Sequence, residues 1–129
     1  MSTLVLDSGA VTALARRGGR LATGAPLTDI HDSLPAIVPS VVLVECLSGR
    51  QHTDAVVNHF LKACVVVDGP HEKLARRASV LRGKAGRGSA VDAVVIAMAE
   101  PGGIVFTYDI KDLTALATHA HDVSVVGMP

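Results

Sequence analysis

Short runs of aliphatic residues alternate along this chain with longer segments that have helical periodicity. Such short, nearly unbroken apolar runs are typical of strands buried on both faces of a parallel sheet. Their alternation with helices predicts βαβ units, and therefore a three-layer α/β/α sandwich with a five-stranded parallel sheet. The expected strands span residues 4–6, 36–38, 64–67, 104–106 and 123–126.

The segments between these runs predict helices, because their apolar residues recur at spacings of three and four. Gly18 and Gly19 should end the first helix, since glycine readily adopts the backbone conformation that closes a helix. The expected helices span residues 8–17, 21–34, 40–49, 52–63, 72–84, 89–100 and 109–119, and the second has the weakest pattern.

The composition is that of one globular domain, covering residues 1–129. Hydrophobic residues make up 49% and charged residues 19%, which excludes a disordered chain. The formal net charge of zero gives no reason in itself to expect a nucleic-acid partner. No leader or membrane-spanning segment is evident, so we expect a cytoplasmic protein. Cys46 and Cys64 stand in apolar runs and should be free, buried thiols.

Glu45 is the residue that fits its surroundings least, because it stands in the apolar run Val41–Leu47. An ionised carboxylate is costly to bury unless another group pairs with it. Glu45 should lie about five residues into its helix, beyond the first turn, in which acids commonly cap helices. No basic residue stands at a helical pairing position, so we expect its partner to come from elsewhere in the fold.

Three aspartates stand where helices are expected to begin: Asp7, Asp92 and Asp109. Asp7 and Asp109 follow the first and fourth strands, so both should lie at the carboxyl edge of the sheet, where ligands bind. Each aspartate also has an ordinary interpretation as a helix cap, and Ser89 with Asp92 matches a capping box. For each aspartate taken singly, the sequence leaves both interpretations open.

Four converging acids would repel one another by roughly 1 to 4 kcal/mol per pair, depending on the local dielectric, unless protons or cations neutralise them. A site made only of oxygen ligands suits Mg²⁺ or Mn²⁺, whereas Zn²⁺ prefers His or Cys. Such a cation can polarise a phosphodiester and lower the pKa of a bound water. The expected catalytic, metal-binding residues are Asp7, Glu45, Asp92 and Asp109.

Other residues could support this site. Asp112 stands three residues after Asp109, on the same helix face, and is a candidate additional ligand. Ser8 and Thr107 add hydroxyl groups at the same sheet edge, where they could orient a carboxylate. Their ordinary interpretation, local capping of the backbone, stays open.

Four segments together resemble the PIN-domain ribonuclease family, and most closely its VapC-type toxins. They are Leu4–Ser8, Ser40–Leu47, Ser89–Ala97 and Thr107–Leu113, in family order along the whole chain. The resemblance implies a single PIN domain in which Asp7, Glu45, Asp92 and Asp109 hold one or two Mg²⁺ or Mn²⁺ ions. Ser8 stands where the family more often has Thr, and residues 21–34 match no family motif.

The same resemblance implies a function and partners. It implies an endoribonuclease that cuts single-stranded or looped RNA as the toxin of a toxin–antitoxin pair. A small VapB-type antitoxin would silence the enzyme, and two copies of the chain would form a homodimer. We expect no membrane partner.

Basic residues are concentrated between positions 73 and 87, which hold six of the twelve Lys and Arg residues and no acid. This segment could form a phosphate-binding surface, although a solvated helix face is the alternative. Arg16, Arg17 and Arg20 form a second cluster at the end of the first helix. The candidate RNA-binding residues are Arg76, Arg77, Arg82, Lys84 and Arg87.

Two other functions compete with the ribonuclease. A receiver-like domain phosphorylated on Asp7 or Asp109 would place an acid pair after its first strand and a Lys after a late strand. Here a single Asp follows the first strand, and the last strand ends in Gly127-Met128-Pro129. The other alternative is a non-catalytic PIN fold that binds RNA or a protein partner.

Overall fold

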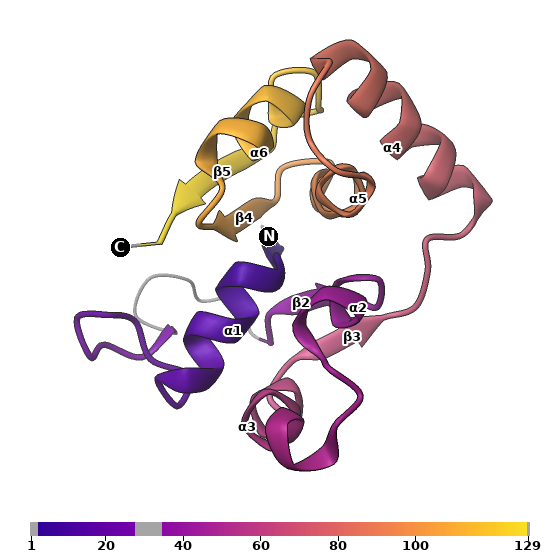
Figure 1. Cartoon of the computed structure of the whole chain (residues 1–129). Helices are drawn as coiled ribbons and strands as arrows, with labels where there is room; N and C mark the ends of the chain where they lie inside the picture. The colour runs from indigo at the N-terminus through magenta and orange to yellow at the C-terminus, as the bar shows by residue number, and fades with distance from the viewer. Residues whose placement is uncertain (1–2, 28–34, 129) are drawn as a thin grey trace.

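The protein is built on one parallel sheet with helices on both faces (Figure 1). The computed structural model describes residues 3–27 and 35–128. The five strands are ordered β3-β2-β1-β4-β5, which confirms the three-layer α/β/α class and the five-stranded parallel sheet. The strands are β1 (Leu4–Leu6), β2 (Ile37–Pro39), β3 (Val65–Val67), β4 (Ile104–Thr107) and β5 (Ser124–Gly127).

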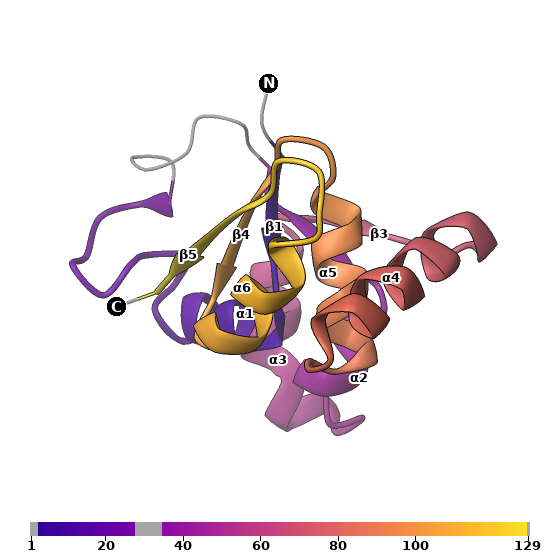
Figure 2. The same ribbon diagram turned by 90° about the horizontal axis from the view of Figure 1, so that it is seen from above.

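The helices form two groups around the sheet. Helix α1 packs against α3 in one group, while α4, α5 and α6 pack on one another in the other group (Figures 1 and 2). None of the helices among the described residues is both long and apolar enough to cross a membrane. The helices are α1 (Ser8–Arg16), α2 (Val42–Cys46), α3 (Gln51–Leu61), α4 (Glu72–Ala85), α5 (Ala90–Ala99) and α6 (Ile110–Ala117).

The core centres on β1 and α5, whose side chains are small and aliphatic. Every residue of β1 is buried, and so is the run Ala93–Ala97 of α5. Helix α5 contacts β1, β2 and β4 on one side and α4 and α6 on the other, so nearly all of its faces are covered. Ala and Val side chains let helix and sheet approach closely, which explains how a chain with 2% aromatic residues builds a core.

Two of the expected helices differ from the structure. The helix expected over 40–49 is much shorter, because the backbone is already extended at Leu47 and Gly49 has a positive φ of 80°. The helix expected over 21–34 is wrong for residues 21–27. They form turns closed by an antiparallel bridge between Arg20 and Pro26, and Gly24 has a positive φ of 86°. Residues 28–34 lie outside the described part of the chain.

Both cysteines are free, as expected, but they are half-buried and not fully buried. Burial raises the pKa of both thiols, and that of Cys64 reaches about 11. Because the thiolate is the reactive form, both side chains are unreactive at neutral pH and contribute chiefly to packing.

The strand order reverses at β1, and this reversal positions the site. From β1 the chain builds β2 and β3 on one side, then crosses back to place β4 and β5 on the other. A crevice forms at such a switch point, beyond the carboxyl ends of the two central strands. Leu6 of β1 pairs with Phe106 of β4, so Asp7 and Thr107 leave the two strands at the same level.

An ion pair ties α4 to the end of α5. The Arg77 guanidinium donates from Nε to Oε1 of Glu100 at 2.8 Å and from Nη2 to Oε2 at 2.7 Å. The same carboxylate accepts from the backbone N–H of His121 at 2.7 Å, and Arg77 also donates to the carbonyl of His119 at 3.2 Å. These contacts hold α4, α5 and the segment after α6 together.

We expect Glu100→Gln to lower the free energy of unfolding at pH 7 by about 2 kcal/mol, because it weakens charge-assisted hydrogen bonds in a poorly solvated place. Arg77 holds the pKa of Glu100 below its ordinary value of 4.5. The stabilisation is therefore complete above pH 4.5 and is lost as the pH falls through the lowered pKa.

Urea unfolding at pH 7 and at successively lower pH measures this difference. Glu72→Gln is the matched control, because Glu72 forms an exposed i,i+4 pair with Arg76 and should contribute below about 0.5 kcal/mol. Equal losses in the two variants would contradict the structural role of the Arg77–Glu100 pair.

Candidate active site

An open cavity of about 540 Å³ lies at the carboxyl edge of β1 and β4, and five carboxyl groups line it. The structure therefore brings together the four acids expected from the sequence and also Asp112. They come from separate parts of the chain: Asp7 after β1, Glu45 in α2, Asp92 in α5, and Asp109 and Asp112 at the start of α6. Ser8, Gly9, Ser89 and Tyr108 complete the lining.

Asp7 is buried and caps α1. Its Oδ1 accepts from the backbone N–H of Ala10 at 2.9 Å, and its Oδ2 accepts from the hydroxyl of Thr107. Burial raises the pKa of Asp7 above its ordinary value of 3.8, although both hydrogen bonds oppose the rise. The negative charges of Asp92 and Asp109 raise the pKa further. A buried acid with acidic neighbours is an arrangement that a cation would stabilise.

Thr107, the last residue of β4, is fully buried and connects two of the acids. Its hydroxyl donates to Asp7 and accepts from the backbone N–H of Asp109 at 2.7 Å. Thr107 therefore acts as a positioning residue. It fixes the orientation of the Asp7 carboxylate and the path of the chain as it leaves β4.

We expect Thr107→Val to lower the free energy of unfolding by about 1–3 kcal/mol, because it leaves the buried Asp7 carboxylate and the part-buried N–H of Asp109 without their partner. The hydrogen bond from Thr107 lowers the pKa of Asp7, so its loss should raise that pKa. Titration of the Asp7 carboxyl by NMR should then show a midpoint at higher pH. Thr107→Ser keeps the hydroxyl and should restore the midpoint, whereas an unchanged midpoint in Thr107→Val would contradict this role.

Asp92 begins α5 in the capping box that the sequence predicted. The Ser89 hydroxyl accepts from the N–H of Asp92 at 3.0 Å, and the Asp92 carboxylate accepts from the N–H of Ser89 at 3.2 Å. Burial raises the pKa of Asp92, and the charges of Asp109 and Glu45 add to this rise. The capping interpretation is confirmed, and it is compatible with the site interpretation, because the capping carboxylate also lines the cavity.

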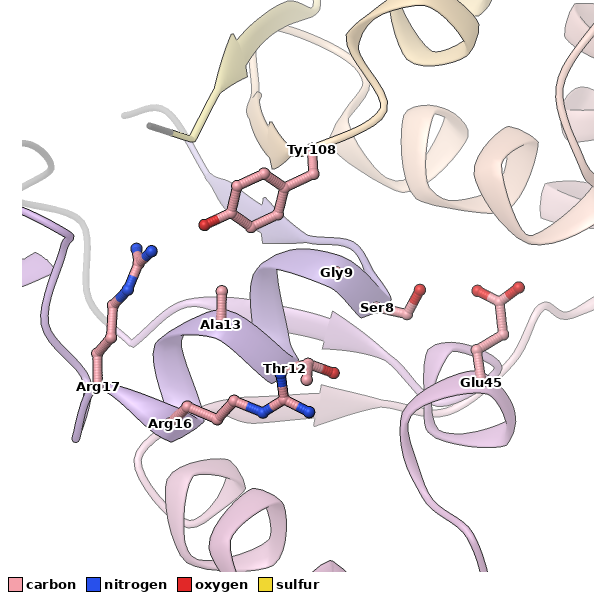
Figure 3. A pocket seen from close by; sticks show the side chains of 8 residues that line it. All are labelled: Ser8, Gly9, Thr12, Ala13, Arg16, Arg17, Glu45 and Tyr108. Carbon is pink, nitrogen blue, oxygen red and sulfur yellow. The ribbon is translucent and has the colours of Figure 1, made fainter.

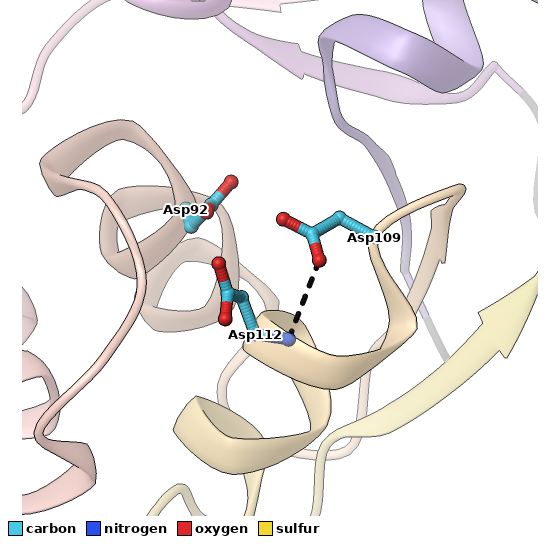
Figure 4. A group of neighbouring side chains, drawn as sticks. All are labelled: Asp92, Asp109 and Asp112. Carbon is cyan, nitrogen blue, oxygen red and sulfur yellow. Dashed lines mark hydrogen bonds between the residues drawn. The ribbon is translucent and has the colours of Figure 1, made fainter.

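Asp109 and Asp112 lie close to Asp92 (Figure 4). One carboxylate oxygen from each of these three residues lies within 4.8 Å of the others. Asp109 caps α6 through a long contact of 3.4 Å from the N–H of Asp112. Asp112 also accepts from Nε of Arg87 at 2.6 Å, so a positive charge already borders the cluster.

The expected surroundings of Glu45 are wrong. Glu45 is exposed, and it lies in the first turn of α2, since that helix begins only at Val42. The apolar run misled the prediction because so short a helix cannot bury all its sides: Val42 is fully buried, but Val44 is 79% exposed. Glu45 belongs to the site because it lines the cavity and its charge raises the pKa of Asp92.

The donors at this cavity fit a hard divalent cation. Among the described residues its lining contains carboxylates and hydroxyls but neither His nor Cys, which disfavours Zn²⁺. The oxygens of Asp92, Asp109 and Asp112 that lie within 4.8 Å of one another are close enough for one ion to be shared. Asp7 and Glu45 line the same cavity, but they do not belong to the group of three acids whose oxygens lie within 4.8 Å of one another. Oxygen ligation is what Mg²⁺ and Mn²⁺ prefer.

The sequence matches none of the protein-family models searched, and no curated protein matches it.

Gly9 is the site residue that sequence reasoning missed. It lines the cavity, and an added Cβ would lie 3.5 Å from the Tyr108 ring, an ordinary contact distance, so a small side chain would also fit there. The available signal was a glycine inside a helical pattern, which commonly marks a packing or functional requirement.

The basic residues between positions 73 and 87, in α4 and just after it, are largely engaged within the protein. Arg77 binds Glu100, and Arg87 binds Asp112. Arg76 pairs with Glu72, while Nε of Arg82 donates to the carbonyl of Gly88 at 3.1 Å. Arg77 has its guanidinium occupied and only 27% of its side chain exposed, so it is poorly placed to bind RNA. Lys84 and Arg82 are exposed, and Arg87 stands nearest the acids.

Proposed function

We propose that this protein is a Mg²⁺- or Mn²⁺-dependent endoribonuclease that cuts single-stranded or looped RNA. The observation that carries the proposal is the cavity at the β1–β4 switch point, where five carboxyl groups from separate segments converge. The raised pKa values of Asp7 and Asp92 support it, since such a cluster calls for a neutralising cation. The resemblance of four segments to the PIN-domain family supports RNA as the substrate.

Each acid has a role in this proposal. Asp92, Asp109 and Asp112 would hold the cation most directly, and Asp7 and Glu45 would complete its surroundings. When bound, the cation would polarise the scissile phosphodiester and activate water for in-line attack. The protein's own groups prepare the site: Thr107 orients Asp7, and the helix caps orient Asp92 and Asp109.

We also propose that the enzyme is the VapC-type toxin of a toxin–antitoxin pair in the cytoplasm. Its partners would be a VapB-type antitoxin and a second copy of the chain. The resemblance supports both, and so do apolar side chains on residues that neighbour the acids in sequence: Val44 is 79% exposed and Ile110 is 51% exposed. Large exposed apolar side chains are suited to contact with another protein.

A cleavage assay tests the central proposal. Purified protein with Mn²⁺ or Mg²⁺ should cut a structured RNA that contains single-stranded loops, and an excess of EDTA should stop the reaction. Restoring the divalent cation should restore cleavage. Undiminished cleavage in EDTA would refute the metal-dependent mechanism. Binding of RNA without cleavage at any cation concentration would favour the non-catalytic PIN fold.

A further inference from the structure

A second cavity opens beside the acidic one (Figure 3). It has a volume of about 490 Å³ and shares four lining residues with the acidic cavity, among them Glu45 and Tyr108. The residues that belong to this second cavity alone are Thr12, Ala13 and Arg16 of α1 and Arg17, which follows the helix directly. The two cavities are therefore neighbouring parts of one surface, acidic at one end and basic at the other.

Helix α1 presents two rows of residues to this second cavity. Ser8, Thr12 and Arg16 recur at intervals of four, and Gly9 and Ala13 lead in the same way to Arg17. The small side chains of Gly9 and Ala13 leave the hollow, and the arginines close its far end. From Ser8 to Arg16 the helix rises about 12 Å, at 1.5 Å per residue. Figure 3 shows the Arg16 side chain reaching back beside Thr12, on the side of Glu45.

The arginines of this cavity lack the protein partners that those of α4 have. No ion pair within residues 3–27 and 35–128 includes Arg16 or Arg17. Arg16 is exposed, so a phosphate entering from solvent can reach its guanidinium. Nη1 of Arg17 also finds no hydrogen-bond acceptor among the described residues, but it is buried and out of reach of such a phosphate. The planar guanidinium matches phosphate oxygens in particular.

We propose that this cavity binds a backbone phosphate of the RNA next to the phosphodiester that the acidic site cleaves. Arg16 would bind that phosphate, and Gly9 and Ala13 would form the floor beneath the chain. The inference rests on the proposed function, because it makes the two cavities a single path for RNA. It assigns the substrate path to α1, whereas the basic run of the sequence pointed to α4.

RNA binding in EDTA tests this assignment without cleavage. The probe is a fluorescently labelled single-stranded oligoribonucleotide of mixed sequence, followed by anisotropy at several salt concentrations. Arg16→Ala should raise the Kd about tenfold, as expected for one lost charge-assisted contact. It should also reduce the slope of log K against log salt by about 0.7, the contribution of one phosphate contact on a single strand. Arg16→Lys should recover part of the affinity, because lysine keeps the positive charge but lacks the planar guanidinium that donates two parallel hydrogen bonds.

Arg20→Ala is the matched control. It removes the same charge from just beyond the same helix, but its Nη1 donates to the carbonyl of Gly24 at 2.9 Å and it lines neither cavity. Its Kd should stay within about twofold of the unmodified protein's, since it contributes only long-range attraction at moderate salt. Equal losses in Arg16→Ala and Arg20→Ala would overturn the inference, because they would indicate general charge attraction.

Ala13→Leu tests the shape of the cavity without changing any charge. Leucine is a good helix former, so the helix should persist while the larger side chain fills the hollow and raises the Kd severalfold. An RNA Kd that is unchanged in both Arg16→Ala and Ala13→Leu would overturn the inference, even if the protein cleaves RNA. Arg16-dependent binding without cleavage would support the phosphate contact at this cavity while rejecting the endoribonuclease.

Discussion

If the proposed function holds, Asp92→Asn should lower RNA cleavage by at least about 100-fold, because it removes a charged oxygen that would hold the cation, and the cation would stabilise the transition state. The variant should keep its fold. Asparagine has nearly the same shape, and its side-chain oxygen can still accept from the N–H of Ser89 in the capping box. The change also removes one charge from a cluster in which Asp109 and Glu45 raise the pKa of Asp92. The metal-free variant should therefore be at least as stable as the unmodified protein.

Single-turnover cleavage rates at saturating Mn²⁺, together with thermal unfolding, separate these two effects. Asp122→Asn makes the same chemical change in the loop before β5, at the other edge of the sheet. Asparagine tolerates the positive φ of 55° found at Asp122, so this control should keep both activity and stability. A folded Asp92→Asn variant that cleaves at the unmodified rate would remove Asp92 from the mechanism.

Divalent cations should stabilise the protein markedly. A ligand that binds only the folded state at 100 times its Kd contributes about 2.7 kcal/mol, which corresponds to a rise in Tm of several degrees for a chain of this size. The physical source is the relief of repulsion among Asp7, Asp92 and Asp109, which interact across the cavity. Thermal unfolding with increasing Mg²⁺ or Mn²⁺ measures the effect without any RNA.

The stabilisation should shrink on acidification, since protons compete with the cation for the same oxygens. Asp7 and Asp92 both have pKa values above the ordinary 3.8, so protonation begins at a higher pH than for exposed aspartates. Without metal, acidification should have the opposite effect and stabilise the protein. Their ionised forms destabilise the fold above the raised pKa, and this penalty fades as the pH falls through it. A Tm that rises equally with Mg²⁺ in Asp92→Asn and in Asp122→Asn would indicate that the cation binds elsewhere.

Much of the fold could be predicted from local patterns. The strands at β1 and β4 and the helices α1, α4 and α5 begin and end within a residue or two of expectation, because buried aliphatic runs and helical periodicity are strong signals. The failures lie where the signal depends on surroundings. The run around Glu45 looked like core, yet α2 is too short to bury it and Val44 faces solvent.

The basic run between positions 73 and 87 shows the same limit. Its charge is visible in the sequence, but the partners that occupy it are not. Glu100, which binds Arg77, stands 23 residues away, and Asp112, which binds Arg87, stands 25 residues away. Charge counts along a chain cannot tell a cation that is paired within the fold from one that can bind a phosphate.

The sequence by itself determined that the chain folds as an α/β sandwich, and that Asp7, Asp92 and Asp109 stand at the starts of helices. Those properties depend on residues near one another in the chain. Only the tertiary structure decided which acids meet. The reversal of strand order at β1 places the carboxyl ends of β1 and β4 side by side, and the caps of α1, α5 and α6 then point into one cavity. Contacts between residues as far apart as Asp7 and Thr107 arise from the order of the strands, which local sequence patterns do not encode.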